Sequence, residues 1–150
     1  MMKPTFGLFT RLLLGGILCY SGFSKAVGPS AEFAASIMNY HLVPSWIATL
    51  AAYGLPWIEL YTGTMLVFGF QSLWAVRAAR GLFGLFVIVL LSALLRGLDI
   101  GSCGCFGAGL SLAPRTTVGI DSLLLAMTFV IPRAGAIPLS LDNWIRRATA

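Results

Sequence analysis

Long apolar runs alternate with short polar breaks along most of this 150-residue chain. Because roughly 20 apolar residues in a helix cross a bilayer, the pattern predicts four membrane-spanning helices at about 6–27, 46–70, 78–95 and 116–131. Pro56 is expected to kink the second helix, and Pro132 to end the fourth, which is the shortest. No internal repeat or linker interrupts the series, so residues 1–150 are expected to form a single all-α transmembrane domain.

A shorter amphipathic segment lies between the first two predicted spans. Gly28-Pro29-Ser30 breaks the first helix, and Ser30 is expected to cap a new one that carries Glu32 in its first turn. Phe33 and Ile37 then recur at helical spacing. The segment, over about 32–44, is too short to cross a bilayer, so we expect a helix that lies at the interface.

Composition and charge agree with a membrane protein. The chain is 58% hydrophobic and only 10% charged, whereas about 25% of residues are charged in a soluble domain. The net charge of +5 is not gathered into a basic cluster with surface aromatics, so a nucleic-acid partner is not expected. The expected surroundings are a lipid bilayer.

The positive charges predict how the spans are oriented, because cytoplasmic loops carry an excess of Lys and Arg. Most of them belong to the two termini and the loop before the third span: Lys3, Arg11, Arg77, Arg80, Arg133, Arg146 and Arg147. Lys25, Arg96 and Arg115 flank the other side. Both termini are therefore expected in the cytoplasm, and the loop after the third span on the outside, which in a bacterial inner membrane is the oxidising periplasm.

That outer loop carries Cys103-Gly-Cys105. A disulfide between two cysteines one residue apart closes only a small, tight ring, and strained, exposed disulfides are the labile ones. The pair is therefore a candidate catalytic site for thiol–disulfide exchange. The alternatives are a static loop staple or two reduced thiols. A metal site is not expected, because structural zinc takes about four Cys or His ligands and the lone His41 belongs to the interfacial segment.

Polar residues within the predicted spans form a second group of candidates. A carboxylate near mid-membrane is costly by about 2.5–3.5 kcal/mol, so Glu59 should face the bundle and have a partner. It could bind a quinone headgroup or move a proton, or it could pair structurally with Lys25 or bond to Tyr61 or Ser24. Cys19 is either a third, resolving thiol or a small buried packing residue.

The fourth span contains Asp121, six residues beyond Arg115. The aspartate could accept a thiol proton near the cysteine loop, or pair with Arg96 or Arg115 as a structural clamp. Arg11, in the first span, is expected to extend to the cytoplasmic surface.

The chain resembles the methylamine-utilisation protein MauE family, within the wider group of DoxX-like four-helix membrane proteins. Four features carry this resemblance over about the whole chain: Gly22-Phe-Ser-Lys25, the segment from Glu32 to Pro44, Pro56-Trp-Ile-Glu59-Leu-Tyr-Thr-Gly63, and Cys103-Gly-Cys-Phe-Gly107. The cysteine motif is the more specific, because the Pro-x-x-Glu helix alone points only to the wider group.

The resemblance implies a membrane component that matures a secreted, disulfide-rich partner, of the type of the methylamine dehydrogenase small subunit. The expected exchange partner is such a periplasmic protein or a thioredoxin-like carrier. Re-oxidation of the pair would need an acceptor, for which a membrane quinone is the candidate cofactor. Two other readings stay open: a non-enzymatic scaffold or chaperone with a structural disulfide, and a carrier that uses Glu59 as its coupling site.

Overall fold

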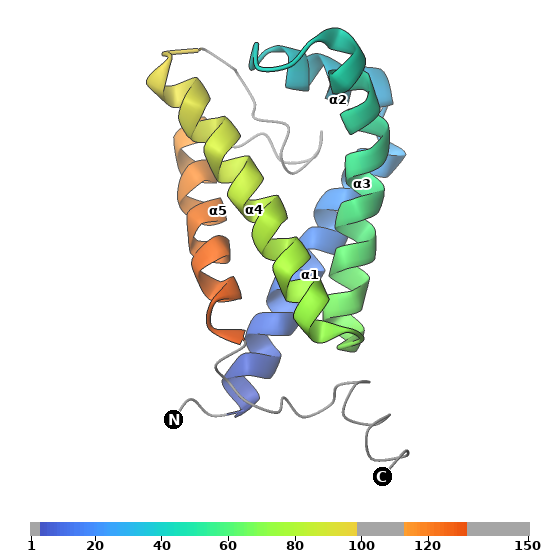
Figure 1. The fold of residues 1–150 in the computed structure, drawn as a ribbon, viewed down its shortest axis with the longest axis vertical. Coiled ribbons are helices and arrows are strands. Elements are labelled where there is room, and N and C mark those ends of the chain that lie inside the picture. Colours follow the sequence, from blue (N-terminus) through green and yellow to red (C-terminus); the bar gives the residue numbers. More distant parts are fainter. Residues whose placement is uncertain (1–3, 99–112, 132–150) are drawn as a thin grey trace.

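A computed structural model describes residues 4–98 and 113–131, which form five helices and no strand (Figure 1). Their bounds are α1 Pro4–Val27, α2 Ser30–Met38, α3 Ser45–Phe68, α4 Ser72–Leu95 and α5 Pro114–Thr128. The prediction of an all-α fold is confirmed, with a short helix between the first two long ones. Cys103, Cys105 and the tail from residue 132 onward lie outside the described residues.

Two of the described helices are long and apolar enough, by length and composition, to cross a membrane: Thr5–Val27 and Leu73–Leu95. Helix α3 is also 24 residues long and contains Pro56 and Glu59, but it is not one of these two candidate spans. Helix α5 has 15 residues, or about 22 Å at 1.5 Å per residue, which is shorter than the ~30 Å hydrocarbon core. A bundle of four spans therefore stays a prediction.

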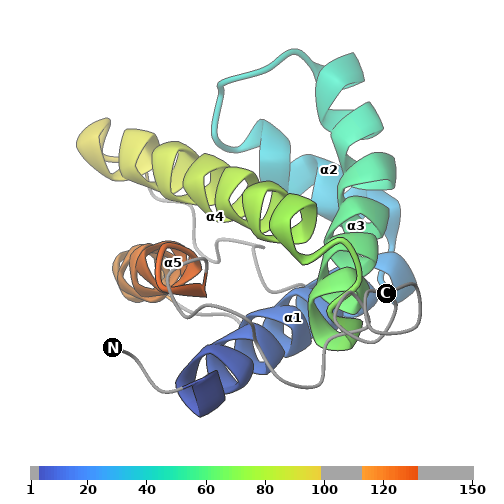
Figure 2. The same cartoon turned by 60° about the horizontal axis from the view of Figure 1, so that its bottom comes forward.

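The long helices run alternately up and down (Figure 1). The start of α1 and the end of α5 lie at one end of the molecule, and α2 lies at the other. Figure 2 shows α1 beside α3 and α4 beside α5, in agreement with their contacts. One apolar core joins all four long helices, and its buried members include Leu14, Leu18, Leu66, Phe83 and Leu124.

Several helix boundaries differ from the predicted ones. Helix α4 begins at Ser72 rather than near residue 78, so it includes Arg77, which the prediction placed before the helix. Helix α3 ends at Phe68, where Gly69 takes the left-handed conformation (φ 65°) that glycine adopts without a steric penalty. The expected cap by Ser30 is wrong, since Pro29 occupies the cap position and Ser30 is the first helical residue.

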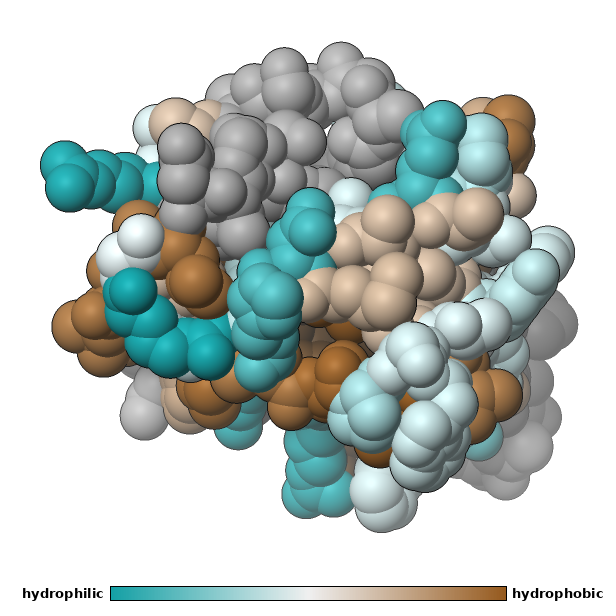
Figure 3. All heavy atoms as spheres, turned by 90° about the horizontal axis from the view of Figure 1, so that it is seen from above, coloured by the Kyte–Doolittle hydropathy of each residue, from teal (hydrophilic) through white to brown (hydrophobic). Residues whose placement is uncertain are grey.

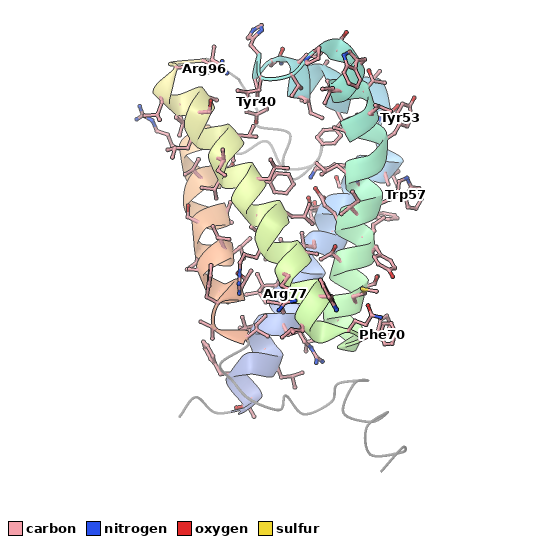
Figure 4. The ribbon with its side chains drawn as sticks, viewed as in Figure 1. Tyr40, Tyr53, Trp57, Phe70, Arg77 and Arg96 are labelled. Carbon is pink, nitrogen blue, oxygen red and sulfur yellow. The ribbon has the colours of Figure 1, made fainter. Side chains whose placement is uncertain are left out.

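The outer faces of the long helices are apolar and aromatic. Tyr53 and Trp57 point away from the bundle (Figure 4) and are 62% and 67% exposed. At the end that carries α2, hydrophilic and hydrophobic side chains lie interspersed (Figure 3). An apolar and aromatic outer face is the kind of surface that a bilayer accommodates.

Candidate functional site

Lys25 of α1 and Glu59 of α3 form a buried ion pair. Lys25 Nζ lies 2.6 Å from Glu59 Oε1, and the side chains are 1% and 0% exposed. Charges so deeply buried are tolerated only when they are paired and hydrogen-bonded. The prediction that these two residues pair is confirmed, whereas the alternative bond to Tyr61 is wrong because that side chain is 65% exposed.

Ser21 completes the site, and the sequence reasoning did not find this role. Its hydroxyl donates to Glu59 Oε2 over 2.8 Å and accepts from Lys25 Nζ over 3.0 Å. Ser21 precedes Lys25 by four residues, so the two side chains lie on the same face of α1. This four-residue spacing was the feature of the sequence that could have predicted the role of Ser21. Both carboxylate oxygens of Glu59 therefore have donors.

Glycines bring α1 and α3 close enough for these contacts. A Cβ at Gly22 would lie 2.7 Å from the Pro56 carbonyl oxygen, closer than real Cβ atoms approach, and 3.0 Å from Glu59 Cβ, which is a tight contact. A Cβ added at Gly15 or at Gly63 would likewise lie 2.8 Å from an atom of the other helix. These glycines lie along the contact between α1 and α3, which we call the seam. Gly15 and Gly22 therefore allow the two helices to approach closely. At Gly16, Gly81 and Gly84, however, no atom of the described residues lies within 4 Å of the added Cβ.

Two aromatic rings face the ammonium group. Lys25 Nζ lies 5.3 Å from the ring centre of Phe33 on α2 and 5.0 Å from that of Phe86 on α4. Ring faces attract a cation, the more so away from water. The site thus draws on four helices.

Beside this site lies a cavity of about 260 Å³. Its walls come from α2, the α2–α3 connection, α3 and α4, and Lys25 is the one charged residue among those that line it in the described part of the chain. Sequence reasoning missed this cavity, because residues far apart in the chain form it.

Arg11 and Asp121 are the other two buried charged residues that the structure describes, each 1% exposed. The expectation that Arg11 reaches the cytoplasmic surface is wrong. It precedes Leu14 and Leu18 by three and seven residues, so it lies on the face of α1 that enters the core. The four buried side chains comprise two cations and two anions, so their formal charges balance.

The predicted clamp between Asp121 and Arg96 or Arg115 is not formed. Arg96 donates instead to the backbone carbonyl of Tyr40, and Figure 4 shows both residues at the α2 end of the molecule. Arg115 is exposed at the start of α5, whereas Asp121 is buried. Arg115 is therefore set apart from the buried Lys25–Glu59 pair, whereas a shared polar site with Asp121 stays a prediction.

Cys19 is a free cysteine on the seam between α1 and α3. A Cβ at Gly63 would lie 2.8 Å from its sulfur, so the thiol fills the space that this glycine leaves. This placement favours the packing role for Cys19. Cys103 and Cys105 lie outside the described residues, and their role stays a prediction.

The family "Methylamine utilisation protein MauE" matches residues 3–135. The chain belongs to the MauE family. Within the described residues, this match includes every member of the Lys25–Glu59–Ser21 site. No solved structure matches the chain.

Two relatives carry the same name as the family. The chain is similar to the methylamine utilization protein MauE of Methylorubrum extorquens, with 32% identity over 139 residues, which are 89% of this chain and 74% of the relative. It is also similar to that of Methylophilus methylotrophus, with 27% identity over 142 residues, 93% of this chain and 73% of the relative. Together with the two apolar helices, this membership indicates a membrane protein.

Proposed function

We propose that this MauE-family protein acts in methylamine utilisation as a four-span inner-membrane protein that supports disulfide formation in a secreted partner. Cys103 and Cys105 are the exchanging pair, and both termini are cytoplasmic. The partner is a periplasmic protein with disulfides, of the methylamine dehydrogenase small-subunit type, or a thioredoxin-like carrier. The family and the Cys-Gly-Cys sequence support this choice of chemistry.

The observation that carries the proposal is where the cysteine segment is attached. The segment follows the end of α4 at Leu95 and precedes the start of α5 at Pro114, and both of these helix ends lie at the α2 end (Figure 1). Arg77 lies toward the opposite end (Figure 4), which also carries the start of α1. By the positive-inside rule, the α2 end then faces the periplasm. Lys25 is buried and adds no surface charge there.

The proposed step is an exchange of one disulfide for another. A thiolate of the partner attacks the Cys103–Cys105 disulfide, and a second partner thiolate resolves the mixed disulfide. The partner loses two electrons and two protons and gains one disulfide, while Cys103 and Cys105 become thiols. A membrane quinone would supply the oxidant that restores the pair by taking up those two electrons and two protons.

The test compares partner oxidation in cells that carry Cys103→Ser, Cys105→Ser or Cys19→Ser. The first two variants are expected to lose oxidation of the partner while the protein still inserts into the membrane, and the third to retain it. Normal partner oxidation in the Cys103→Ser variant would rule out the exchange mechanism.

A second candidate, a non-enzymatic scaffold, is favoured by the contacts of the buried site. Every hydrogen bond that Lys25 makes in the described part of the chain joins it to α1 or α3, as a purely structural clamp would. In a scaffold the two cysteines would stay oxidised throughout. The same three variants separate the candidates, because a scaffold needs its fold but no cycling thiols.

A further inference from the structure

The cavity between α2, α3 and α4 has a volume of about 260 Å³, and its surface in the described part of the chain is almost wholly apolar. The polar groups of its walls are engaged elsewhere. Lys25 Nζ donates to Ser21 and Glu59, and the Ser36 hydroxyl donates to the Glu32 carbonyl over 3.0 Å. An occupant of this cavity is therefore held by packing and not by hydrogen bonds.

Water does not suit such a cavity. A buried water makes about three hydrogen bonds, and an apolar cavity of about 150 Å³ stays dry. An empty cavity is also unfavourable, because the atoms that line it have no van der Waals partners on one side. Among the described helices, α2 packs mainly on α3. An apolar occupant would therefore supply the contacts between α2 and α4.

The cavity is long in the direction of α3 and has an apolar opening. Ile47, Ala51 and Leu55 line it at four-residue spacing, so its wall on α3 extends over about 12 Å. Helices α3 and α4 lie close together at one end and diverge toward the α2 end (Figure 1). Leu42, between α2 and α3, and Leu85 of α4 line the cavity and are 44% and 48% exposed. A long apolar group can therefore enter between these helices.

We propose that this cavity holds one acyl chain of a membrane phospholipid, with the head group outside. In a bilayer, acyl chains are the long apolar groups that surround such an opening. Glu32, Asn39 and His41 are exposed on α2 and just after it, so this end of the molecule is polar enough to lie beside a head group. The inference rests on the membrane placement in the proposed function and not on its thiol chemistry.

The experiment maps photolabelling by lipid chains in vesicles that contain the full-length protein. The probe is a phosphatidylcholine with a diazirine on one acyl chain, and mass spectrometry locates the labelled residues. We expect labels on residues that line the cavity, such as Ile47 and Val89. Trp57 is 67% exposed on the outer face of α3 and serves as the reference for ordinary contact with lipid.

The head group should matter little, because the cavity surface is almost wholly apolar. Replacing the phosphatidylcholine probe by a phosphatidylethanolamine or phosphatidylglycerol probe with the same chains is expected to change labelling of the cavity less than twofold. A preference of tenfold or more for one head group would contradict recognition through the chain alone.

Variants separate a chain inside the cavity from lipid on the outer surface. Ala51→Phe and Val43→Phe each place a ring in the cavity. Both are expected to reduce labelling of the cavity at least fivefold and to leave labelling of Trp57 unchanged. Leu50→Phe is the matched control, since Leu50 lies one residue earlier on α3 and is 65% exposed. It should retain the labelling of the cavity.

Three further results would overturn the inference. The first is a cavity that stays unlabelled while Trp57 is labelled. The second is equal labelling of the cavity in Ala51→Phe, Val43→Phe and Leu50→Phe. The third is loss of that labelling when a short-chain benzoquinone is added in an amount equal to the protein, which would assign the cavity to a quinone.

The Cys103→Ser, Cys105→Ser double variant distinguishes this inference from the exchange mechanism. Labelling of the cavity should persist in it, because no thiol contributes to the walls. Failure of the exchange mechanism would then leave the lipid site standing, and an unlabelled cavity would leave the exchange mechanism standing.

Discussion

Lys25 and Glu59 join helices α1 and α3 through a 2.6 Å ion pair that is closed off from solvent. Ser21 bonds to both partners, so the pair is a hydrogen-bonded cluster rather than an isolated contact. Such a cluster fixes the relative position of two helices because neither charge can leave without stranding the other.

Breaking this pair on one side should destabilise the protein strongly. Lys25→Met leaves the Glu59 carboxylate buried without its cation, and the expected loss is about 3–5 kcal/mol. The double change Lys25→Met, Glu59→Leu should recover most of that loss, because no unpaired charge remains. Denaturant unfolding of the purified protein measures both effects. Arg115→Met, at an exposed position, serves as the control. A single variant as stable as the control would contradict a structural role for the pair.

Adding one methyl group at Gly22 should destabilise the protein, because the seam between α1 and α3 has no room for it. Gly22→Ala would place its Cβ 2.7 Å from the carbonyl oxygen of Pro56, and overpacking of this kind costs about 1–3 kcal/mol. Gly16→Ala is the matched control, since it lies on the same helix and meets no described atom within 4 Å. It should be neutral or slightly stabilising, because alanine favours helix. Thermal unfolding distinguishes the two, and equal midpoints would contradict the close packing.

Arg80 should hold the end of α5 against α4. Its guanidinium donates to the Thr128 hydroxyl over 3.3 Å and to the Thr128 carbonyl over 3.2 Å, and it stacks 3.9 Å from the ring centre of Phe129. Arg80→Met removes a donor from the last turn of a helix, where carbonyls need partners. Hydrogen exchange of the last turn of α5 should accelerate about tenfold.

Arg77→Met is the control for that change, because Arg77 stacks on Trp74 within α4 and makes no hydrogen bond or ring contact with α5 in the described part of the chain. Its effect on exchange in α5 should be small. Equal acceleration in both variants would mean that loss of charge, rather than loss of the contact with α5, is responsible.

Cys19 should behave as a packing residue. Cys19→Ala keeps a small side chain against Gly63 and is expected to cost less than about 1.5 kcal/mol, without changing the redox state of Cys103 and Cys105. Cys19→Leu should cost more, since its extra atoms meet the backbone of α3. Denaturant unfolding of the two variants measures the cost in stability, and thiol trapping of Cys19→Ala and of the unaltered protein reports the redox state of the cysteines. A mixed disulfide between Cys19 and either loop cysteine would instead support the resolving role.

The sequence predicted those features that depend on its composition and on how deep a residue would lie in a membrane. The five helices follow from apolar run lengths and from the break at Pro29, and the Lys25–Glu59 pair from the cost of a lone carboxylate in a membrane. It did not predict how each helix is rotated. Arg11 was expected at the surface, but it lies on the same face of α1 as Leu14 and Leu18, and its side chain is therefore buried in the core. The cavity depends on how α2 packs over α3 and α4, which no local pattern encodes.

The most direct test of the proposed function is the redox state of Cys103 and Cys105 in intact cells. A membrane-impermeant thiol reagent is applied with and without prior reduction, in cells that carry Cys19→Ala so that only the pair can react. The account predicts a partly reduced pair that is labelled from outside before reduction, and more fully labelled after it. A pair that stays oxidised until a reductant is added, in every growth condition, would contradict a cycling site and identify a structural staple.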